Sequence, residues 1–259
     1  MPARKVFVGN IYPTTKGGDV IVLEYVRDTH IVVEFLDEYR YRTVTQTAAI
    51  TKGLIHNPYA RTFYGVGYMG VGRFSTDPTN PETYKVYKAW ICMIERCSSV
   101  DKKLRDPSSV LSYSCSEWHN LQVFGEWYCS QKGWDEPKWQ LDKDLMGSGN
   151  KLYSPETCVI LPPVLNTSIK YINDGPLNKN NLPRGVGYNI KAKRYITDCR
   201  IYGVEGKAPT MYFKTAEEAF VWYKEKKEAL IKCLALEYKD RIEERAFDRL
   251  MSFSVKSPF

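Results

Sequence analysis

The sequence predicts an α+β fold, with strands near both ends of the chain and helices in the centre and at the C-terminal end. Three observations support this prediction. Short β-branched and aromatic runs lie between turn residues in the first third, apolar residues recur at helical spacing after residue 83, and a strand–strand–strand–helix order follows residue 184. The 259 residues suffice for one large domain or for two to three small ones.

The region 1–75 predicts a small closed β-barrel. Four runs rich in Val, Ile, Phe and Tyr follow one another, separated by turn signals such as the KGGD sequence at 16–19. Such regular short strands are typical of small barrels. Arg40 and Arg42 alternate with tyrosines in the fourth run, which fits either a clamp on a nucleic-acid backbone or ordinary surface and core alternation. The Pro- and Asn-rich stretch 76–83 marks the end of this domain.

The centre of the chain predicts helices with an aromatic core. Apolar residues recur at helical spacing in a segment that begins near Thr83, and a second aromatic run occupies 117–127. The first run places its apolar side chains at Tyr87, Trp90, Ile91, Ile94 and Cys97. We expect these aromatic side chains to form core rather than a stacking platform.

The C-terminal region 182–250 predicts a three-stranded sheet followed by one long helix. The candidate strands are 185–190, 194–201 and 210–213. Thr215 and Glu218 have the spacing of a capping box, in which each side chain bonds the backbone N–H of the other residue. No Pro or Gly follows until after residue 250, so we expect the helix to extend to about that point.

The distribution of charge predicts a polyanionic partner for this sheet. The chain has a formal net charge of +7, and the segment 184–200 contains one acidic residue, Asp198. Alternation along the second strand places Arg194 and Ile196 on one face, with Tyr195 and Thr197 on the other. We expect the helix to cover the tyrosine face, which leaves the arginine face for nucleic acid.

Other features of the composition restrict the classes of function. No apolar run reaches 18 residues, and the first residues lack the apolar core of a signal peptide, so we expect a cytoplasmic protein without a membrane partner. The seven cysteines contain no CxxC pair and have no nearby histidine pair. This spacing does not suit structural zinc, and we expect reduced thiols.

The C-terminal sequence resembles the Apetala-two (ethylene-response-factor type) DNA-binding domain. The resemblance rests on RGVGYNIKAKRYITDCRI at 184–201 and on MYFKTAEEAFVWYKEKKE at 211–228. It implies that double-stranded DNA is the partner. The implied base and phosphate contacts come from Arg184, Tyr188, Lys191, Lys193, Arg194 and Arg200. Bulky Trp222 replaces a residue that is small in the family, so no sequence preference carries over.

The region 84–170 resembles the HNH-type centre of bacteriophage homing-endonuclease-like proteins, which have a ββα architecture. The matching segments are WICMIERC at 90–97, CSEWHNLQVF at 115–124, LDKD at 141–144, GN at 149–150, YSPETC at 153–158 and Asn166. In phage proteins such centres follow small barrels of the Tudor or KOW type, which region 1–75 also resembles. By this resemblance Asp142 and Asp144 are the expected ligands of a Mg²⁺ ion, with Asn166 as a further ligand or orienting residue.

The resemblance departs from the family at the residue that activates water. Active members have histidine where this chain has Lys143. A lysine is protonated at neutral pH unless it is strongly desolvated, and is then a poor general base. His119 is the candidate substitute, although a packing role suits it as well. Thr157 also replaces an asparagine of the family motif.

Three functions fit these features. The first is a phage-type DNA-binding protein related to homing endonucleases, with weak or absent cleavage. The second is an active Mg²⁺-dependent site-specific nicking endonuclease. The third is a protein-binding antagonist of a host defence or host enzyme, because a fold does not determine its function. The sequence gives no oligomeric state and no DNA target.

Overall fold

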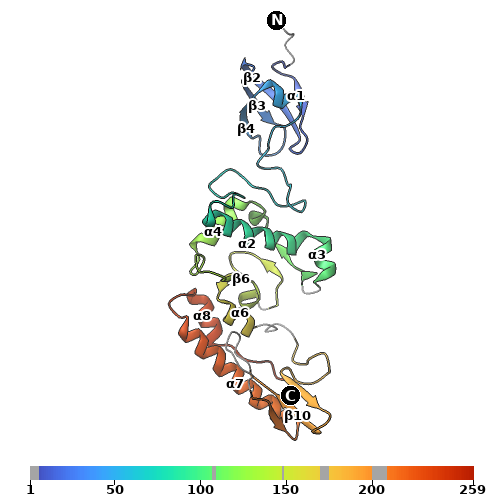
Figure 1. Cartoon of the computed structure of the whole chain (residues 1–259), viewed down its shortest axis with the longest axis vertical. Coiled ribbons are helices and arrows are strands. Elements are labelled where there is room, and N and C mark those ends of the chain that lie inside the picture. The colour runs from blue at the N-terminus through green and yellow to red at the C-terminus, as the bar shows by residue number, and fades with distance from the viewer. Residues whose placement is uncertain (1–5, 107–108, 148, 170–174, 200–208) are drawn as a thin grey trace. The chain divides into compact units, whose positions relative to one another are not determined.

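The computed structural model describes residues 6–106, 109–147, 149–169, 175–199 and 209–259. Contacts divide the chain into two compact units, residues 1–126 and residues 127–259. Both contain helices and strands (Figure 1), which confirms the predicted α+β class. The predicted central region 84–170 has residues in both units.

An antiparallel four-stranded sheet forms the N-terminal part of the first unit. Its strands are β1 (Ile11–Pro13), β2 (Asp19–Arg27), β3 (His30–Phe35) and β4 (Arg42–Thr45), in the spatial order β1-β2-β3-β4. The last three match predicted runs, whereas β1 begins after the predicted run at 6–10. One face of the sheet is buried, as alternation requires. Its core consists of Val6, Val20, Val22, Ile31, Val33, Phe35, Ile50 and Ile55.

The prediction of a closed barrel was wrong. Among the described residues β1 pairs only with β2 and β4 only with β3, so the sheet is open. The chain after β4 forms the short helix α1 (Thr47–Thr51) instead of another strand, and its Ile50 enters the core. β1 has three residues and ends in Pro13, which has no N–H to donate to another strand.

Helices and aromatic residues form the second part of the first unit. α2 (Pro81–Ser98) starts at a cap where the Asn80 side chain accepts a bond from the Thr83 N–H. It is followed by α3 (Val100–Arg105), β5 (Tyr113–Ser114), the 3-10 helix η2 (Ser116–His119) and α4 (Leu121–Ser130), whose last four residues belong to the second unit. Trp90 and Trp118 are buried, and Trp90 Nε1 donates to the Trp118 carbonyl at 2.8 Å. The prediction that these aromatics form core is confirmed.

After the end of α4, the second unit contains a small antiparallel pair of strands followed by a helix. β6 (Gln140–Asp142) pairs with β8 (Val159–Leu161), and α6 (Pro163–Ser168) follows. Between the two strands lie α5 (Asp144–Gly147) and β7 (Leu152–Tyr153). All three residues of β8 are buried, so this strand anchors the segment in the core of its unit.

The C-terminal sheet has the predicted three strands. β9 (Val186–Asn189), β10 (Arg194–Thr197) and β11 (Met211–Phe213) are antiparallel, with β10 in the middle. α7 (Ala216–Glu237) starts at the predicted capping box between Thr215 and Glu218. It packs on one face of the sheet (Figure 1) and buries Ala219 and Phe220 there.

The prediction of a single long helix extending to about residue 250 was wrong. α7 ends at Glu237, and a separate helix α8 (Glu244–Met251) packs against α5 and α7. No Pro or Gly causes the break. Tertiary contacts favour the turn instead, because Ile242 is fully buried and the Arg241 guanidinium pairs with Glu136 at 2.7 Å and lies over the Trp139 ring. Packing therefore overrides local helix propensity here.

No helix in the described part of the chain is both long enough and apolar enough to cross a membrane.

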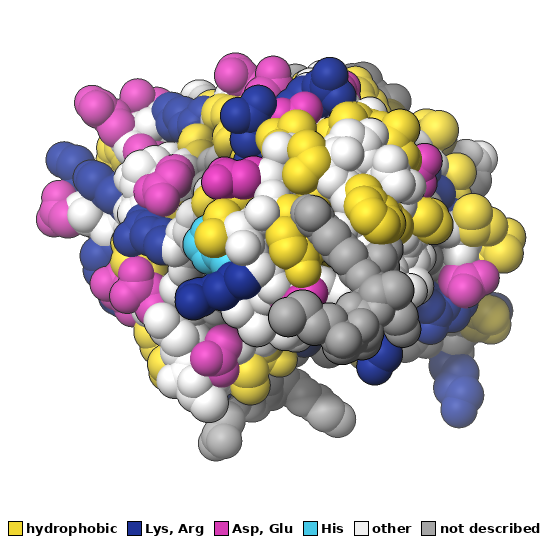
Figure 2. All heavy atoms as spheres, turned by 90° about the horizontal axis from the view of Figure 1, so that it is seen from above, with side chains coloured by type: hydrophobic (Ala, Val, Ile, Leu, Met, Phe, Trp, Pro, Cys, Tyr) yellow, Lys and Arg dark blue, Asp and Glu magenta, His cyan; other side chains and the backbone are white. Residues whose placement is uncertain are grey.

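The face shown in Figure 2 mixes basic, acidic and hydrophobic side chains, and neither sign of charge dominates it. The exposed hydrophobic residues of the N-terminal sheet include Ile11, Val26 and Val44.

Candidate nucleic-acid interface

Among the described residues, α7 covers one face of the C-terminal sheet and no element covers the other, which is called the open face. Tyr195 pairs with Phe213, and both pack with Val186 against α7. Residues that are direct cross-strand partners share a face. Arg194, next to Tyr195, therefore lies on the opposite face, and so does Ile196, whose partners are Gly187 and Tyr212. The predicted alternation along β10 matches this arrangement.

Three cations lie at the β9–β10 end of this face without acidic partners among the described residues. Lys191 and Lys193 lie in the β9–β10 turn, and Arg194 begins β10; all three are exposed. None forms an ion pair with any residue that the structure describes, and Arg194 Nη1 donates only a weak bond to the Lys193 carbonyl at 3.3 Å. No Asp or Glu occurs between Arg184 and Thr197. The turn therefore presents its positive charge to solvent.

Two other predicted contact residues have different positions. Tyr188 is a cross-strand partner of Tyr195, so it shares the face that α7 covers, although it is 48% exposed at the edge strand. The Arg184 guanidinium donates to the carbonyls of Gly175 and Leu177 at 3.1 Å each, which ties down the segment before β9. Arg200 lies outside the described residues.

Sequence reasoning missed two residues of the open face. Tyr212 pairs with Ile196 and is 54% exposed. Continuing the same register by one residue places exposed Lys214 beside Arg194. The alternation along residues 211–214 shows that Tyr212 and Lys214 share a face. Which face of the sheet that is depends on the register of β11 against β10, which the sequence does not give.

Asp142 is a structural carboxylate in this fold. It ends β6 and is buried, and its Oδ1 accepts bonds from the backbone N–H groups of Asp144 at 3.0 Å and Leu145 at 2.8 Å. These bonds form an Asx-type turn that starts α5. Burial raises the pKa of Asp142 to about 6, and the two backbone bonds and nearby Lys143 only partly offset this.

Lys143 and Asp144 neutralise each other. The Lys143 side chain is 6% exposed, and its Nζ lies 2.6 Å from Asp144 Oδ1. The same ammonium faces the ring of buried Tyr153, 5.5 Å from its centroid. Lys151 Nζ is a second cation near that oxygen, at 3.9 Å. Lys143 is thus a packed internal counter-ion rather than a base directed at solvent.

Asn166 holds α6 to the start of β6. Its Nδ2 donates to Gln140 Oε1 at 2.6 Å. Gln140 and Asp142 are two residues apart and share a face of β6, so Asn166 and Asp142 lie at opposite ends of this short strand. The amide is engaged in positioning the helix.

These residues do not fit a Mg²⁺ ion. Mg²⁺ requires several oxygen ligands in octahedral geometry. One oxygen of Asp142 is committed to backbone N–H groups, and one oxygen of Asp144 holds an ammonium. Within the described ranges no group of three or more His, Cys, Asp or Glu side chains is arranged to bind a metal. We therefore derive no metal-dependent step from this segment.

His119 belongs to the first unit, whereas the two aspartates belong to the second. It ends η2, and its carbonyl accepts a bond from the Tyr68 N–H at 2.9 Å. Burial lowers the pKa of the His119 imidazole, and the charge of Arg61 lowers it further. The side chain lies in a partly buried position at the end of η2.

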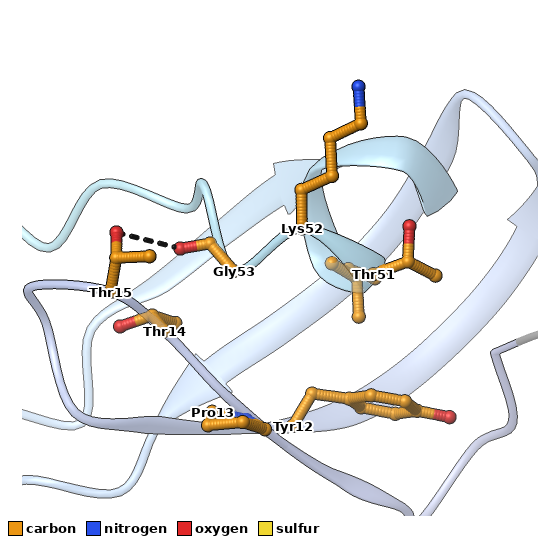
Figure 3. A pocket seen from close by; sticks show the side chains of 8 residues that line it. Tyr12, Pro13, Thr14, Thr15, Thr51, Lys52 and Gly53 are labelled. Atoms are coloured by element: carbon orange, nitrogen blue, oxygen red, sulfur yellow. Dashed lines mark hydrogen bonds between the residues drawn. The ribbon is translucent and has the colours of Figure 1, made fainter.

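A pocket of about 450 Å³ lies between β1 and α1 in the first unit. It is lined by Tyr12, Pro13, Thr14, Thr15, Ile50, Thr51, Lys52 and Gly53. Figure 3 shows that the Lys52 side chain points away from Tyr12 and Pro13. The Thr15 hydroxyl is engaged with the Gly53 carbonyl at 3.2 Å. The polar groups here mainly support the fold, and we assign no ligand.

No protein-family model matches the chain, and neither a curated protein nor a solved structure gives a significant match. The likeness to homing-endonuclease-like and Apetala-two-type proteins therefore stays a prediction from the motifs. The geometry of the open sheet face is the independent observation on which a function can be argued.

Proposed function

We propose that this protein binds double-stranded DNA through the open face of its C-terminal sheet, without the metal-dependent cleavage of a nuclease. The observation that carries the proposal is the set of cations on and beside that face, which have no acidic partners among the described residues. A narrow antiparallel sheet fits the major groove of B-form DNA, where its side chains reach base edges and phosphates.

The packing of α7 supports the same assignment. The helix covers the face with Tyr195 and Phe213, so within the described part of the chain the opposite face is left for a ligand. Phosphate contacts by lysine and arginine position a protein on DNA, whereas contacts to base edges give specificity. The exposed turn cations suit the first role, and the side chains of the sheet suit the second.

Fluorescence anisotropy with a duplex of roughly 20 base pairs tests this proposal by measuring the salt dependence of binding. Neutralising about four phosphates gives a slope of log affinity against log salt concentration of roughly −3 to −4. We expect Arg194→Glu to weaken binding by about tenfold to a hundredfold and to make the slope shallower. Salt-insensitive binding would contradict the proposal and favour a protein partner.

Lys52→Glu is the matched control. Lys52 is exposed in the first unit, and its reversal changes the net charge as much as reversal of Arg194 does. If the sheet forms the interface, Lys52→Glu leaves affinity within about twofold of wild type, because Lys52 is not part of the open face and exposed charges outside an interface are largely screened at physiological salt. Equal losses for both variants would show only a general charge effect.

A nicking assay tests the second half of the proposal. Supercoiled DNA is incubated with the protein in Mg²⁺ or Mn²⁺, beside the double variant Asp142→Ala, Asp144→Ala. We expect no strand scission by either protein at concentrations that saturate binding. Metal-dependent nicks that disappear in the double variant would establish a nuclease.

A further inference from the structure

The open face of the C-terminal sheet contains two rows of different chemistry. In one row Asn189 pairs with Arg194, and exposed Lys214 directly follows β11, one residue past the Tyr195–Phe213 pair. In the other row Ile196 lies between Gly187 and Tyr212. Successive rows on one face are about 6.6 Å apart along a strand. A cationic row therefore runs beside an apolar and aromatic one.

The apolar row is built so that Ile196 lies close to the sheet. A Cβ atom added at Gly187 would lie 3.3 Å from Ile196 Cγ1 and 3.7 Å from Cδ1. The isoleucine side chain thus extends over the space that glycine leaves. Its other neighbour, Tyr212, is 54% exposed. The row offers a shallow apolar surface that another molecule can approach closely.

We infer that this row reads the C5 methyl group of pyrimidines, thymine above all, in the major groove. The inference rests on the proposed function and names what the sheet selects. Thymine differs from the other bases in presenting a methyl group there, and proteins recognise it by apolar contact. The cationic row beside it provides the charge complementarity that draws a duplex onto this face.

Duplexes that differ only in this methyl group test the inference without a known target sequence. One pair is an alternating A·T duplex and its A·U counterpart. The other is an alternating G·C duplex and the same duplex with 5-methylcytosine. Binding of each is measured by competition against one labelled duplex. We expect a preference of about fourfold or more for the methylated member of each pair, the value for burying one methyl group.

Two variants separate base reading from phosphate binding. Ile196→Ser removes the apolar contact, so the methyl preference should fall to about one, while salt-dependent binding of the non-methylated duplex persists. Arg194→Ala should weaken binding of both members equally and keep the preference. Because Ile196 is half-buried, the exposed variant Tyr212→Ser provides a second test that does not depend on its packing. Thermal unfolding confirms that each variant is folded.

The possible outcomes distinguish this inference from the proposed function. Equal affinity of wild-type protein for both members of each pair, with the salt dependence intact, overturns methyl reading but leaves DNA binding. Failure to bind any duplex overturns both. Tighter binding of single-stranded than of duplex DNA would overturn methyl reading in the major groove. A preference that survives in both Ile196→Ser and Tyr212→Ser shows that other residues read the methyl group.

Discussion

The two sheets of this protein contain similar patterns of basic and aromatic residues but use their arginines differently. In the N-terminal sheet, Arg42 Nε lies 2.6 Å from Glu34 Oε2 and Arg40 Nη1 lies 3.6 Å from Glu34 Oε1. In the C-terminal sheet, Arg194 begins a strand whose neighbouring cations have no acidic partner in the described residues. The first pair of arginines satisfies a buried carboxylate, and the other cations remain available.

This difference teaches that a basic pattern indicates a nucleic-acid surface only where the fold leaves its charges uncompensated. The sequence YRYR at 39–42 and the sequence KAKRY at 191–195 both have the basic and aromatic residues that can bind a phosphate backbone. Glu34 decides against the first, because it is buried and needs the two guanidinium groups. The geometry therefore favours ordinary surface and core alternation over a nucleic-acid clamp for Arg40 and Arg42.

The largest expected effect is on the free energy of unfolding, and it is tested by substituting one glycine in each sheet region. Gly185 and Gly18 both have left-handed backbone conformations, with φ of +83° and +82°. A Cβ at Gly185 would lie 2.5 Å from the Tyr223 ring, whereas nothing lies within 4 Å of a Cβ at Gly18. We expect Gly185→Ala to reduce the free energy of unfolding by about 2–5 kcal/mol, the sum of backbone strain and overpacking.

Gly18→Ala is the control, with an expected loss of about 1–2 kcal/mol from backbone strain alone. Urea denaturation followed by tryptophan fluorescence measures both variants. Equal losses would mean that the contact between the segment before β9 and α7 is looser than the geometry indicates.

The second prediction extends the comparison to Asp142, another group committed to the fold. Asp142→Asn keeps the oxygen that accepts from the Asp144 and Leu145 N–H groups but cannot ionise. Burial raises the pKa of Asp142 to about 6 in the folded protein. The unfolded chain ionises near the ordinary value of about 3.9, so ionisation disfavours folding progressively between these two values.

Relative to Asp142→Asn, wild-type protein should therefore lose about 2–3 kcal/mol of unfolding free energy as the pH rises from 4 to 7. Denaturation curves of both proteins across that range measure the difference. A difference that stays constant with pH would show that the carboxylate ionises as easily in the folded state as in water, contrary to its burial.

The smallest expected effect comes from a substitution that gives the N-terminal sheet unpaired arginines, as the C-terminal sheet has. Glu34→Gln removes the negative charge and leaves Arg40 and Arg42, whose side chains are 60% and 67% exposed, without it. We expect non-specific DNA affinity at low salt to rise about twofold to fivefold, because the two cations become available to phosphates. Electrophoretic mobility shifts with a random-sequence duplex measure this change.

Glu24→Gln is the matched control, since it changes the net charge equally at an exposed position of the same sheet. A similar rise in both variants would attribute the effect to net charge alone. No rise in either would mean that released arginines do not suffice to make this face a DNA surface.

Much of the fold was predictable from local patterns. The capping box at Thr215, the helix beginning near Thr83 and most strands followed from short-range preferences, which depend on neighbours in the sequence. The closed barrel and the uninterrupted C-terminal helix were wrong, because α1 took the place of a further strand and the buried Ile242 required a turn. Both errors arise from packing between segments distant in sequence.

The sequence by itself determined where α7 begins and which strand face of β10 carries Arg194, because capping and alternation are local properties of the chain. Only the tertiary structure decided which polar groups are available. It placed Tyr212 beside Ile196, committed Asp142 to a turn and paired Lys143 with Asp144. Partners of this kind depend on strand register and burial, and a sequence read one segment at a time specifies neither.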